Sequence, residues 1–333
     1  MNRIILALAV PLLTVACTTN STQNVNISYT CDVATWQDFA TSAISYTYDD
    51  GCPNQFSTAA PLMDKYGFKG TFYLVTQWLS DWSTFAECAQ NGHEIASHTL
   101  THPNLCEISV DSATAELSQS QQLIIDNTGT ECFSIAYPYC AKPDETLVSQ
   151  YYGAARICDC YIESATPRNY LAISSFGIGS ESTRNNAESV ISLFEQTAEK
   201  GGWCVLLIHE IDDGPGYSPF SSAALDTTLQ YLDAHRDQFW TATFSDVAKY
   251  ARERDAAQIT LTTASDKQIN ISIATGLSSD IYNVPLTLKL TLPDDWTGAT
   301  VEQHGATTEI SASDGTIVFD AQPDGSTVTV RKL

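Results

Sequence analysis

Residues able to bind a metal ion and to move protons occur in three short segments of the chain. Asp49 and Asp50 are adjacent, His98 and His102 lie four residues apart, and His209 follows much later. Two histidines and one aspartate suffice to hold a zinc-like ion with an open coordination position. A second aspartate and a third histidine then remain available as base and acid. This set of residues is typical of a metal-assisted hydrolase.

Each segment also has an ordinary explanation when it is considered alone. One helical turn would put the rings of His98 and His102 on the same face, and a loop could also bring them together, but many histidines are only hydrogen-bonded. An Asp-Asp-Gly sequence is a common turn. In such a turn Asp49 and Asp50 can straddle one ion, whereas on a strand they would point to opposite sides. The combination of the segments favours the metal site.

Strand-like and helix-like stretches alternate from about residue 31 to residue 252, and such alternation predicts a parallel sheet or a barrel. The candidate residues Asp49, His98, Tyr139 and His209 fall just past the ends of predicted strands, at the rim where α/β barrels build their sites. The expected strands are Ala43–Tyr48, Gly70–Val75, Glu94–Ser97, Cys132–Tyr137 and Trp203–Ile208, and the expected helices are Phe56–Tyr66, Ser112–Asn127, Ala187–Lys200, Ser222–Arg236 and Phe244–Arg254.

The sequence pattern changes after about residue 256. Short runs of alternating apolar and polar residues, separated by Gly, Asn and Asp turns, begin at Gln258, Gln268, Leu286, Thr316 and Thr327. Runs of this kind predict a small antiparallel β-sandwich. We therefore expect a signal peptide at 1–17, a polar tether at 18–37, an α/β domain at 38–252 and the sandwich domain at 256–333.

The N-terminus has the pattern of an export signal. A short basic start is followed by the apolar run Ile4–Val15, which is too short to span a bilayer as a mature helix. Leu13–Cys17 resembles a bacterial lipobox, although Thr14 stands where an aliphatic residue is usual. We expect lipidation at Cys17 and a protein in the periplasm or at the cell surface, anchored to the outer membrane through this lipid only. An ordinary cleaved signal is the alternative.

Composition excludes some partners and indicates an oxidising compartment. The chain has 39 Asp and Glu against 16 Lys and Arg, a formal net charge of −23, which argues against binding to nucleic acid or to anionic lipid. Ten cysteines are many for this length and favour disulfides. With Cys17 set aside the remainder is odd, so at least one thiol is expected to be free or paired between chains. For Cys158 and Cys160, disulfides are preferred to metal binding.

Four motifs, in order along the chain, resemble those of the polysaccharide deacetylase (NodB-homology) family, carbohydrate esterase family 4. They are Tyr48-Asp-Asp-Gly, His98-Thr-x-x-His, Tyr137-Pro-Tyr and Leu206-Leu-Ile-His, and the resemblance covers about residues 38–250. It implies a distorted (β/α) barrel, usually of seven strands. It also implies a divalent metal ion, Zn²⁺ above all, and an acetylated glycan as substrate.

The resemblance assigns a role to each matching position. Water activated at the metal loses a proton to the base and attacks the acetyl carbonyl, a backbone N–H helps to bind the oxyanion, and an acid protonates the leaving group. The implied metal ligands are Asp50, His98 and His102. The implied base is Asp49, the acid is His209, the oxyanion donor is the N–H of Tyr139, and Leu207 lines the pocket for the acetyl methyl group.

Two departures from the family pattern stand out. The third motif normally begins with an arginine that orients the base, and this position is Ala136. We hypothesise that Arg156 supplies a displaced guanidinium, and the alternative is that it is a surface arginine or a member of an ordinary ion pair. The family's Asp/Trp element that supports the acid histidine has no clear counterpart, and Asp159 is a weak candidate for it.

The sequence therefore predicts a metal-dependent deacetylase acting on glycans that contain N-acetylglucosamine, such as chitin-like polysaccharides or oligosaccharides. The first alternative is an O-deacetylase such as an acetylxylan esterase, and the second is a glycan-binding protein with a degenerate site. Trp78, Trp82 and Trp203 are candidates for stacking on sugar rings, although a place in the buried core is favoured for Trp203, which begins a predicted strand. The loop Glu210–Tyr217 is a candidate for a sugar subsite and is equally well explained as a plain turn. The sequence does not determine the oligomeric state.

Overall fold

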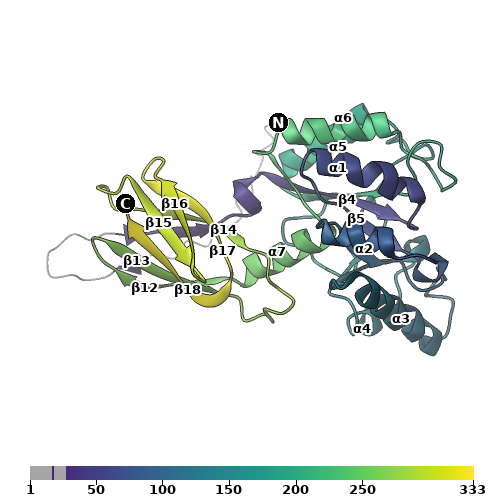
Figure 1. Cartoon of the computed structure of the whole chain (residues 1–333), viewed down its shortest axis with the longest axis horizontal. Helices are drawn as coiled ribbons and strands as arrows, with labels where there is room; N and C mark the ends of the chain where they lie inside the picture. The colour runs from purple at the N-terminus through teal and green to yellow at the C-terminus, as the bar shows by residue number, and fades with distance from the viewer. Residues whose placement is uncertain (1–16, 19–27) are drawn as a thin grey trace, which may run out of the picture. The chain divides into compact units, whose positions relative to one another are not determined.

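The computed structural model describes residues 17–18 and 28–333 of the chain (Figure 1). It contains two compact units, one formed by Ala40–Ala251 and the other by the segment up to Phe39 together with Arg252–Leu333. The predicted signal segment up to residue 16, and residues 19–27 of the predicted tether, lie outside the described residues. The tether prediction differs from the structure at its end, because Cys31–Val33 forms a strand, β3, of the second unit.

The first unit is a distorted parallel barrel, as the fold prediction requires. Seven of its described strands run in the order β8-β7-β6-β5-β4-β10-β9, and β11 pairs with the beginning of β4. A bridge between Arg156 and Ile173, just before β9, brings the two ends of this order together. The strands are β4 (Ser42–Asp49), β5 (Thr71–Leu74), β6 (Glu94–Ser97), β7 (Ser134–Ala136), β8 (Ala154–Arg156), β9 (Phe176–Gly177), β10 (Trp203–Ile208) and β11 (Phe239–Thr241).

Helices connect the strands and begin and end at recognisable capping residues. The side chain of Ser109 caps α3, and the left-handed Gly129 ends it, with a φ of 72°. Helices α2 (Ser83–Gln90) and α4 (Glu145–Val148) and the short strands β8, β9 and β11 are not predicted from the sequence. The helices are α1 (Ala60–Lys65), α2 (Ser83–Gln90), α3 (Val110–Thr128), α4 (Glu145–Val148), α5 (Ala187–Lys200), α6 (Ser222–Ala234) and α7 (Phe244–Ala256), with short helical turns η1 (Gln37–Phe39), η2 (Gln55–Ala59), η3 (Thr76–Trp78) and η4 (Pro138–Cys140).

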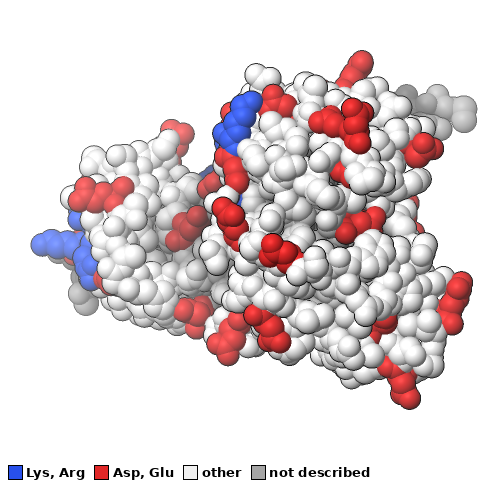
Figure 2. All heavy atoms as spheres, turned by 45° about the vertical axis from the view of Figure 1, so that its right-hand side comes forward, with Lys and Arg blue, Asp and Glu red and all other residues white. Residues whose placement is uncertain are grey.

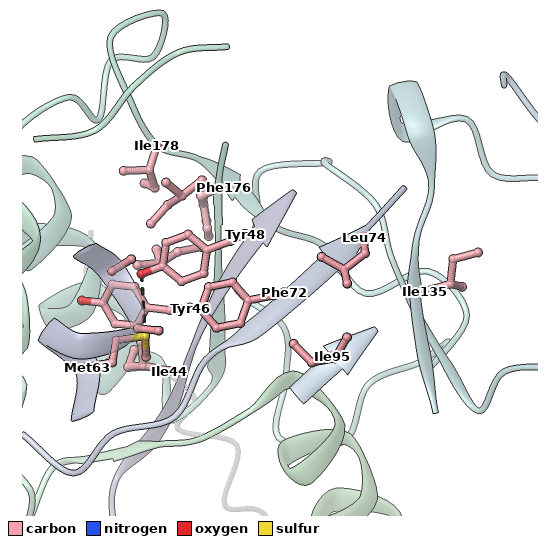
Figure 3. Packing of buried hydrophobic residues seen from close by; sticks show 14 of the residues in the cluster. Ile44, Tyr46, Tyr48, Met63, Phe72, Leu74, Ile95, Ile135, Phe176 and Ile178 are labelled. Atoms are coloured by element: carbon pink, nitrogen blue, oxygen red, sulfur yellow. Dashed lines mark hydrogen bonds between the residues drawn. The ribbon is translucent and has the colours of Figure 1, made fainter. Parts of the chain in front are cut away.

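The main core lies between the barrel strands and the helices that cover them. Every residue of β4 and of β10 is buried, which is expected for parallel strands covered on both faces. In Figure 3 the ring of Tyr48 lies on that of Phe72, with centroids 4.9 Å apart, and its hydroxyl donates to the sulfur of Met63. Burial of this apolar surface holds the carboxyl ends of β4 and β10 side by side.

The second unit is an antiparallel β-sandwich, as predicted. One sheet has the order β12-β13-β18-β15-β16 and the other the order β17-β14-β3. Alternate residues of β13 are buried, which is the pattern of a strand with one face on the core. The strands are β12 (Gln258–Ala264), β13 (Gln268–Ala274), β14 (Leu286–Thr291), β15 (Gly298–Gln303), β16 (Ala306–Ser311), β17 (Thr316–Ala321) and β18 (Asp324–Lys332), and a separate pair joins β1 (Cys17–Thr18) to β2 (Ser28–Tyr29).

Acidic side chains are scattered over the face shown in Figure 2, with few basic ones among them. This distribution agrees with charge that is spread along the sequence rather than gathered in one segment. Among the described residues, no helix is both long enough and apolar enough to cross a membrane.

Candidate active site

Three neighbouring parts of the barrel bring the candidate residues to one rim. Strand β4 ends at Asp49, and β6 ends one residue before His98. Strand β10 pairs with β4 up to Tyr48 and Ile208, so that Asp49 and His209 come next on adjacent parallel strands. The carboxyl ends of parallel strands lie at the same edge, and the site is therefore assembled from segments far apart in the sequence.

The predicted metal ligands lie together in the structure. One ligand atom each from Asp50, His98 and His102 falls within 4.8 Å of the others. Oδ1 of Asp50 is 3.7 Å from Nε2 of His98 and 3.7 Å from Nε2 of His102. Two imidazole nitrogens and one carboxylate form a set suited to zinc, with room for a fourth ligand. The histidines meet through a loop rather than a helical turn, because Thr99 and His102 have left-handed φ values of 70° and 66°.

The protonation behaviour of these residues fits a bound cation. Oδ1 of Asp50 is buried and has no hydrogen-bond partner among the described residues. Burial and the adjacent Asp49 carboxylate raise the pKa of Asp50 to about 6, a cost that a positive ion at this point would remove. Burial lowers the pKa of His98 to about 4 and also lowers that of His102, so both rings are neutral and able to ligate at neutral pH.

Hydrogen bonds from neighbouring elements fix the two histidines. Nδ1 of His98 lies 2.8 Å from the main-chain oxygen of Ala136, which makes Nδ1 the protonated nitrogen and leaves the Nε2 lone pair facing Asp50. The hydroxyl of Thr99 accepts from the N–H of His102. Glu116 on α3 accepts from both the N–H and the hydroxyl of Thr101. Glu116 was not identified from the sequence, since a carboxylate in a helix carries no distinguishing local signal.

Arg156 makes the contact that the displaced-arginine hypothesis requires. Its Nη2 donates to Oδ2 of Asp49 at 2.5 Å, and both side chains are almost fully buried. Nη1 of Arg156 donates to Ser175, and the guanidinium lies over the ring of Tyr73. Burial raises the pKa of Asp49, but the Arg156 guanidinium, His98 and His209 outweigh it and leave that pKa below its ordinary value.

Sheet register explains how Arg156 can replace an arginine at position 136. Strand β8 lies beside β7, and Ala136 is paired directly with Arg156. The guanidinium therefore enters the barrel interior from the neighbouring strand, one step sideways from the family position. Arg156 leaves Oδ1 of Asp49 buried and without a hydrogen-bond partner among the described residues. That oxygen is the part of the carboxylate available to accept a proton.

His209 lies in a different kind of environment. It lines a pocket of about 360 Å³ together with Leu207, Gly177 and Tyr217. The ring of Tyr217 meets that of His209 edge-on, with centroids 5.1 Å apart. No described side chain forms a hydrogen bond with the His209 imidazole, and Asp159, the weak candidate for this contact, forms none.

The loop that follows His209 is built around a buried carboxylate. Glu210 is completely buried, and its two oxygens accept from the N–H groups of Ile211 and Gly216. A side chain on Gly214 would collide with this carboxylate, and one on Gly216 would collide with the sulfur of Cys52. The loop is thus more than a plain turn, because these bonds deliver Tyr217 to the pocket beside His209. The role of Glu210 could not be identified from the sequence, because a carboxylate in a loop carries no distinguishing local signal.

Tyr139 lies beside the metal cluster, with its ring 4.9 Å from that of His102. It is largely exposed and has a left-handed φ of 57°. The next residue, Cys140, forms a disulfide with Cys158, which ties the loop after β7 to the loop after β8. The predicted disulfide bonding is confirmed for Cys158 and is wrong for Cys160, whose thiol is free. The free thiols among the described residues are Cys31, Cys52, Cys88, Cys106, Cys132, Cys160 and Cys204.

Comparison with known proteins agrees with the fold and the motifs. Residues 37–155 match the family model described as polysaccharide deacetylase. The resemblance to the polysaccharide deacetylase family is thereby confirmed for this range, which contains the first three of the four motifs. A putative polysaccharide deacetylase from Mycobacterium smegmatis superimposes with a TM-score of 0.51 at 18% identity, covering 70% of this chain and 98% of the other. That likeness supports the fold alone.

Two curated relatives share parts of the sequence. A gellan lyase from a Bacillus species is 29% identical over 296 residues, an alignment that covers 82% of this chain and 12% of the relative. The putative polysaccharide deacetylase YxkH of Bacillus subtilis (strain 168) is 28% identical over 106 residues, covering 30% of this chain and 38% of the relative. The aligned region spans less than half the length of either relative.

Proposed function

We propose that this protein is a metal-dependent deacetylase that removes acetyl groups from glycans containing N-acetylglucosamine. The observation that carries the proposal is the state of the adjacent carboxylates. Asp49 and Asp50 each keep one buried oxygen without a partner among the described residues. Buried polar atoms are seldom left unpaired in a structural role. One oxygen faces two neutral histidines, and the other belongs to a carboxylate held by Arg156.

Asp50, His98 and His102 would hold the ion, for which Zn²⁺ is our proposal because of the nitrogen and oxygen donor set. When bound, such an ion supplies a Lewis acid that polarises an acetyl carbonyl and makes water more acidic. The hydrogen bond between His98 and Ala136 orients one ligand before any ion arrives. The Thr99 and Glu116 contacts do the same for the loop that ends in His102.

The remaining residues divide the proton transfers. Asp49 takes a proton from the attacking water at Oδ1, since Oδ2 is occupied by Arg156. The lowered pKa keeps this carboxyl ionised and ready to act at neutral pH. The N–H of Tyr139 stabilises the oxyanion, and Leu207 contacts the acetyl methyl group in the pocket beside β9. His209 donates a proton to the leaving nitrogen as acetate departs.

Exposed aromatic side chains around the site support a glycan as substrate. Trp78, Tyr139 and Tyr217 are 58%, 67% and 61% exposed, an unusual state for such large rings. Trp78 and Tyr139 lie against His102, and Tyr217 lies against His209. Rings that flank a site on two sides offer flat apolar surfaces to the C–H faces of sugars.

The test is acetate release from chitin oligosaccharides and from acetylated xylan, with the metal removed and restored. We expect release from the chitin oligosaccharides that is lost with chelation, regained with Zn²⁺ and absent in Asp49→Asn. Release from xylan alone would replace the N-deacetylase proposal by the O-deacetylase alternative. No release from either substrate, together with retained glycan binding, would leave the glycan-binding alternative.

We further propose that the protein is exported and anchored by a lipid at Cys17, on the basis of the apolar run and the lipobox-like sequence. Cell fractionation of the parent and of Cys17→Ala tests this. We expect the parent in the membrane fraction and the variant in the soluble fraction. Equal distribution of the two proteins would rule out the anchor.

A further inference from the structure

The buried amide of Gln55 joins the two strand ends that carry the proposed base and acid. Its Nε2 lies 2.5 Å from the main-chain oxygen of Asp49 and 2.5 Å from that of His209. Both partners are carbonyl oxygens, which only accept, so the NH₂ side of the amide must face them and both of its hydrogens are used. Gln55 is completely buried, so water does not compete for these bonds.

The amide of Gln55 lies where the pairing of β4 with β10 ends, and this position gives it a structural role. The paired register of β4 and β10 ends at Tyr48 and Ile208. The pairing of β4 with β10 does not extend beyond this point, and the side chain of Gln55 donates to the next main-chain oxygen of each strand. Gln55 thereby takes the place of one further ladder step. The step fixes the main chain from which the Asp49 and His209 side chains project.

Local structure holds Gln55 in position. It opens the π-helical turn η2, and its N–H donates to the main-chain oxygen of Cys52. The same turn continues into α1, whose residues Ala60 and Met63 are buried in the main core. Short π-helical turns such as η2 are frequent at functional sites. The amide is thus carried by a rigid element rather than by a mobile loop.

We propose that Gln55 is a positioning residue that sets the separation of the base Asp49 and the acid His209. The inference rests on the proposed function of the site. It assigns to Gln55 no contact with substrate and no proton transfer. Its effect is geometric, since both residues must reach the same acetyl group from opposite sides, and a displacement of about 1 Å costs about 10²-fold in rate.

Asn54 offers a matched control. Its Nδ2 donates to the main-chain oxygen of Ile211 at 2.8 Å, which is the same kind of bond from the same turn to the same loop. That bond lies two residues beyond His209 and does not touch Asp49. Loss of either side-chain amide removes a hydrogen bond to a main-chain oxygen, but only loss of Gln55 frees the base and the acid from each other.

The experiment compares Gln55→Met with Asn54→Leu in acetate release from chitin oligosaccharides, with thermal unfolding and zinc content measured on both. We expect both variants to lose thermal stability and to retain zinc. Gln55→Met should lose about 10²-fold in kcat with KM changed by less than about twofold, whereas Asn54→Leu should keep kcat within about threefold. Equal kcat losses in the two variants would overturn the proposal.

A second variant and a structural comparison keep the proposal testable if Gln55→Met does not fold or if the parent has no activity. If Gln55→Met fails to fold, Gln55→Asn takes its place, because the shorter side chain keeps the donor but cannot span both carbonyls. If the parent releases no acetate, the proposed function fails, and crystal structures of the parent and variants then decide the role of Gln55. A distance between the Asp49 and His209 carbonyl oxygens that grows in Gln55→Met and not in Asn54→Leu supports it. An unchanged distance refutes it.

Discussion

The two halves of the candidate site are held in different ways. In the metal half, contacts act on side chains and on the loop itself, as the His98 ring bonds to Ala136 and the loop before His102 bonds to Glu116. In the acid half, the main chain of His209 is bonded to Gln55, but no described side chain bonds to its ring. The ring of His209 meets the ring of Tyr217 edge-on.

This difference indicates what each half has to do. A metal ligand must present one lone pair in one direction, so a fixed ring lowers the cost of binding. An acid must keep its proton and release it to a leaving group, and a ring without a carboxylate partner can turn toward the substrate. Preorganisation therefore acts on a ligand side chain as well as on the main chain in the metal half, and on the main chain alone in the acid half.

Removing a metal ligand should have the largest effect. Asp50→Ala deletes the carboxylate that faces both histidines, and we expect zinc binding to be lost and acetate release to fall by about 10⁴-fold, because the whole electrophilic contribution disappears. Metal analysis and acetate assays measure both quantities. Full zinc content with full activity in this variant would place the ion elsewhere.

Removing the acid should separate the two halves. His209→Ala should keep its zinc and lose about 10³-fold in kcat, since only the proton transfer to the leaving group is affected. The comparison with Asp50→Ala needs the same metal analysis on both proteins. Loss of zinc from His209→Ala would show that the metal half and the acid half are not independent.

The ion pair with Arg156 should appear in the pH dependence. Arg156→Met leaves Asp49 buried without its guanidinium, so the pKa of Asp49 rises. Because the base must be ionised, the acid limb of kcat/KM should move to higher pH, with a loss of about 10²-fold near neutrality. Removal of one partner of a buried pair should also cost about 3 kcal/mol of stability.

In the parent, the lowered pKa of Asp49 implies a stability contribution that is present above the ordinary carboxyl pKa and is lost as the pH falls through the lowered value. Arg168→Met, which removes an exposed arginine from the loop after β8, is the control for charge. An unshifted acid limb in Arg156→Met would mean that Arg156 does not act on the base.

The smallest effect is expected from the support of the histidine loop. Glu116→Gln keeps the size of the side chain but weakens its bonds to Thr101, and zinc affinity should fall by about 10-fold while kcat at saturating zinc stays nearly constant. Competition with a chelator measures the affinity, and Glu107→Gln, an exposed carboxylate in the same region, is the control. If both variants bind zinc with the affinity of the parent, the bonds from Glu116 to Thr101 do not support the metal site.

The barrel and the histidine and aspartate cluster could be predicted because their signals are local. Apolar runs such as Trp203–Ile208 mark buried strands, and the residue after each strand falls at one rim. Strand β3 could not be predicted in this way, because three residues carry no period and only the open edge of β14 gives them a partner.

The supporting residues of the site depend on contacts between distant segments. The position of Arg156 follows from the register of β7 and β8, and nothing in Ala154–Arg156 alone reveals that it lies opposite Ala136. Gln55 bonds to the main chain, which has the same groups at every residue, so its partners leave no trace in residue type. Sequence patterns therefore supply the reacting groups, and the folded structure supplies what holds them.

The left-handed backbone of the site has a consequence for evolution and engineering. Asp50, His102 and Tyr139 have φ values of 74°, 66° and 57°, a region that favours glycine and costs other residues about 1 kcal/mol or more each. Chemistry requires a carboxylate and an imidazole at two of these positions, so the domain is less stable than its topology permits. A selection for thermostability that ignores activity would therefore favour glycine at these positions. The resulting protein would be more stable and catalytically inactive.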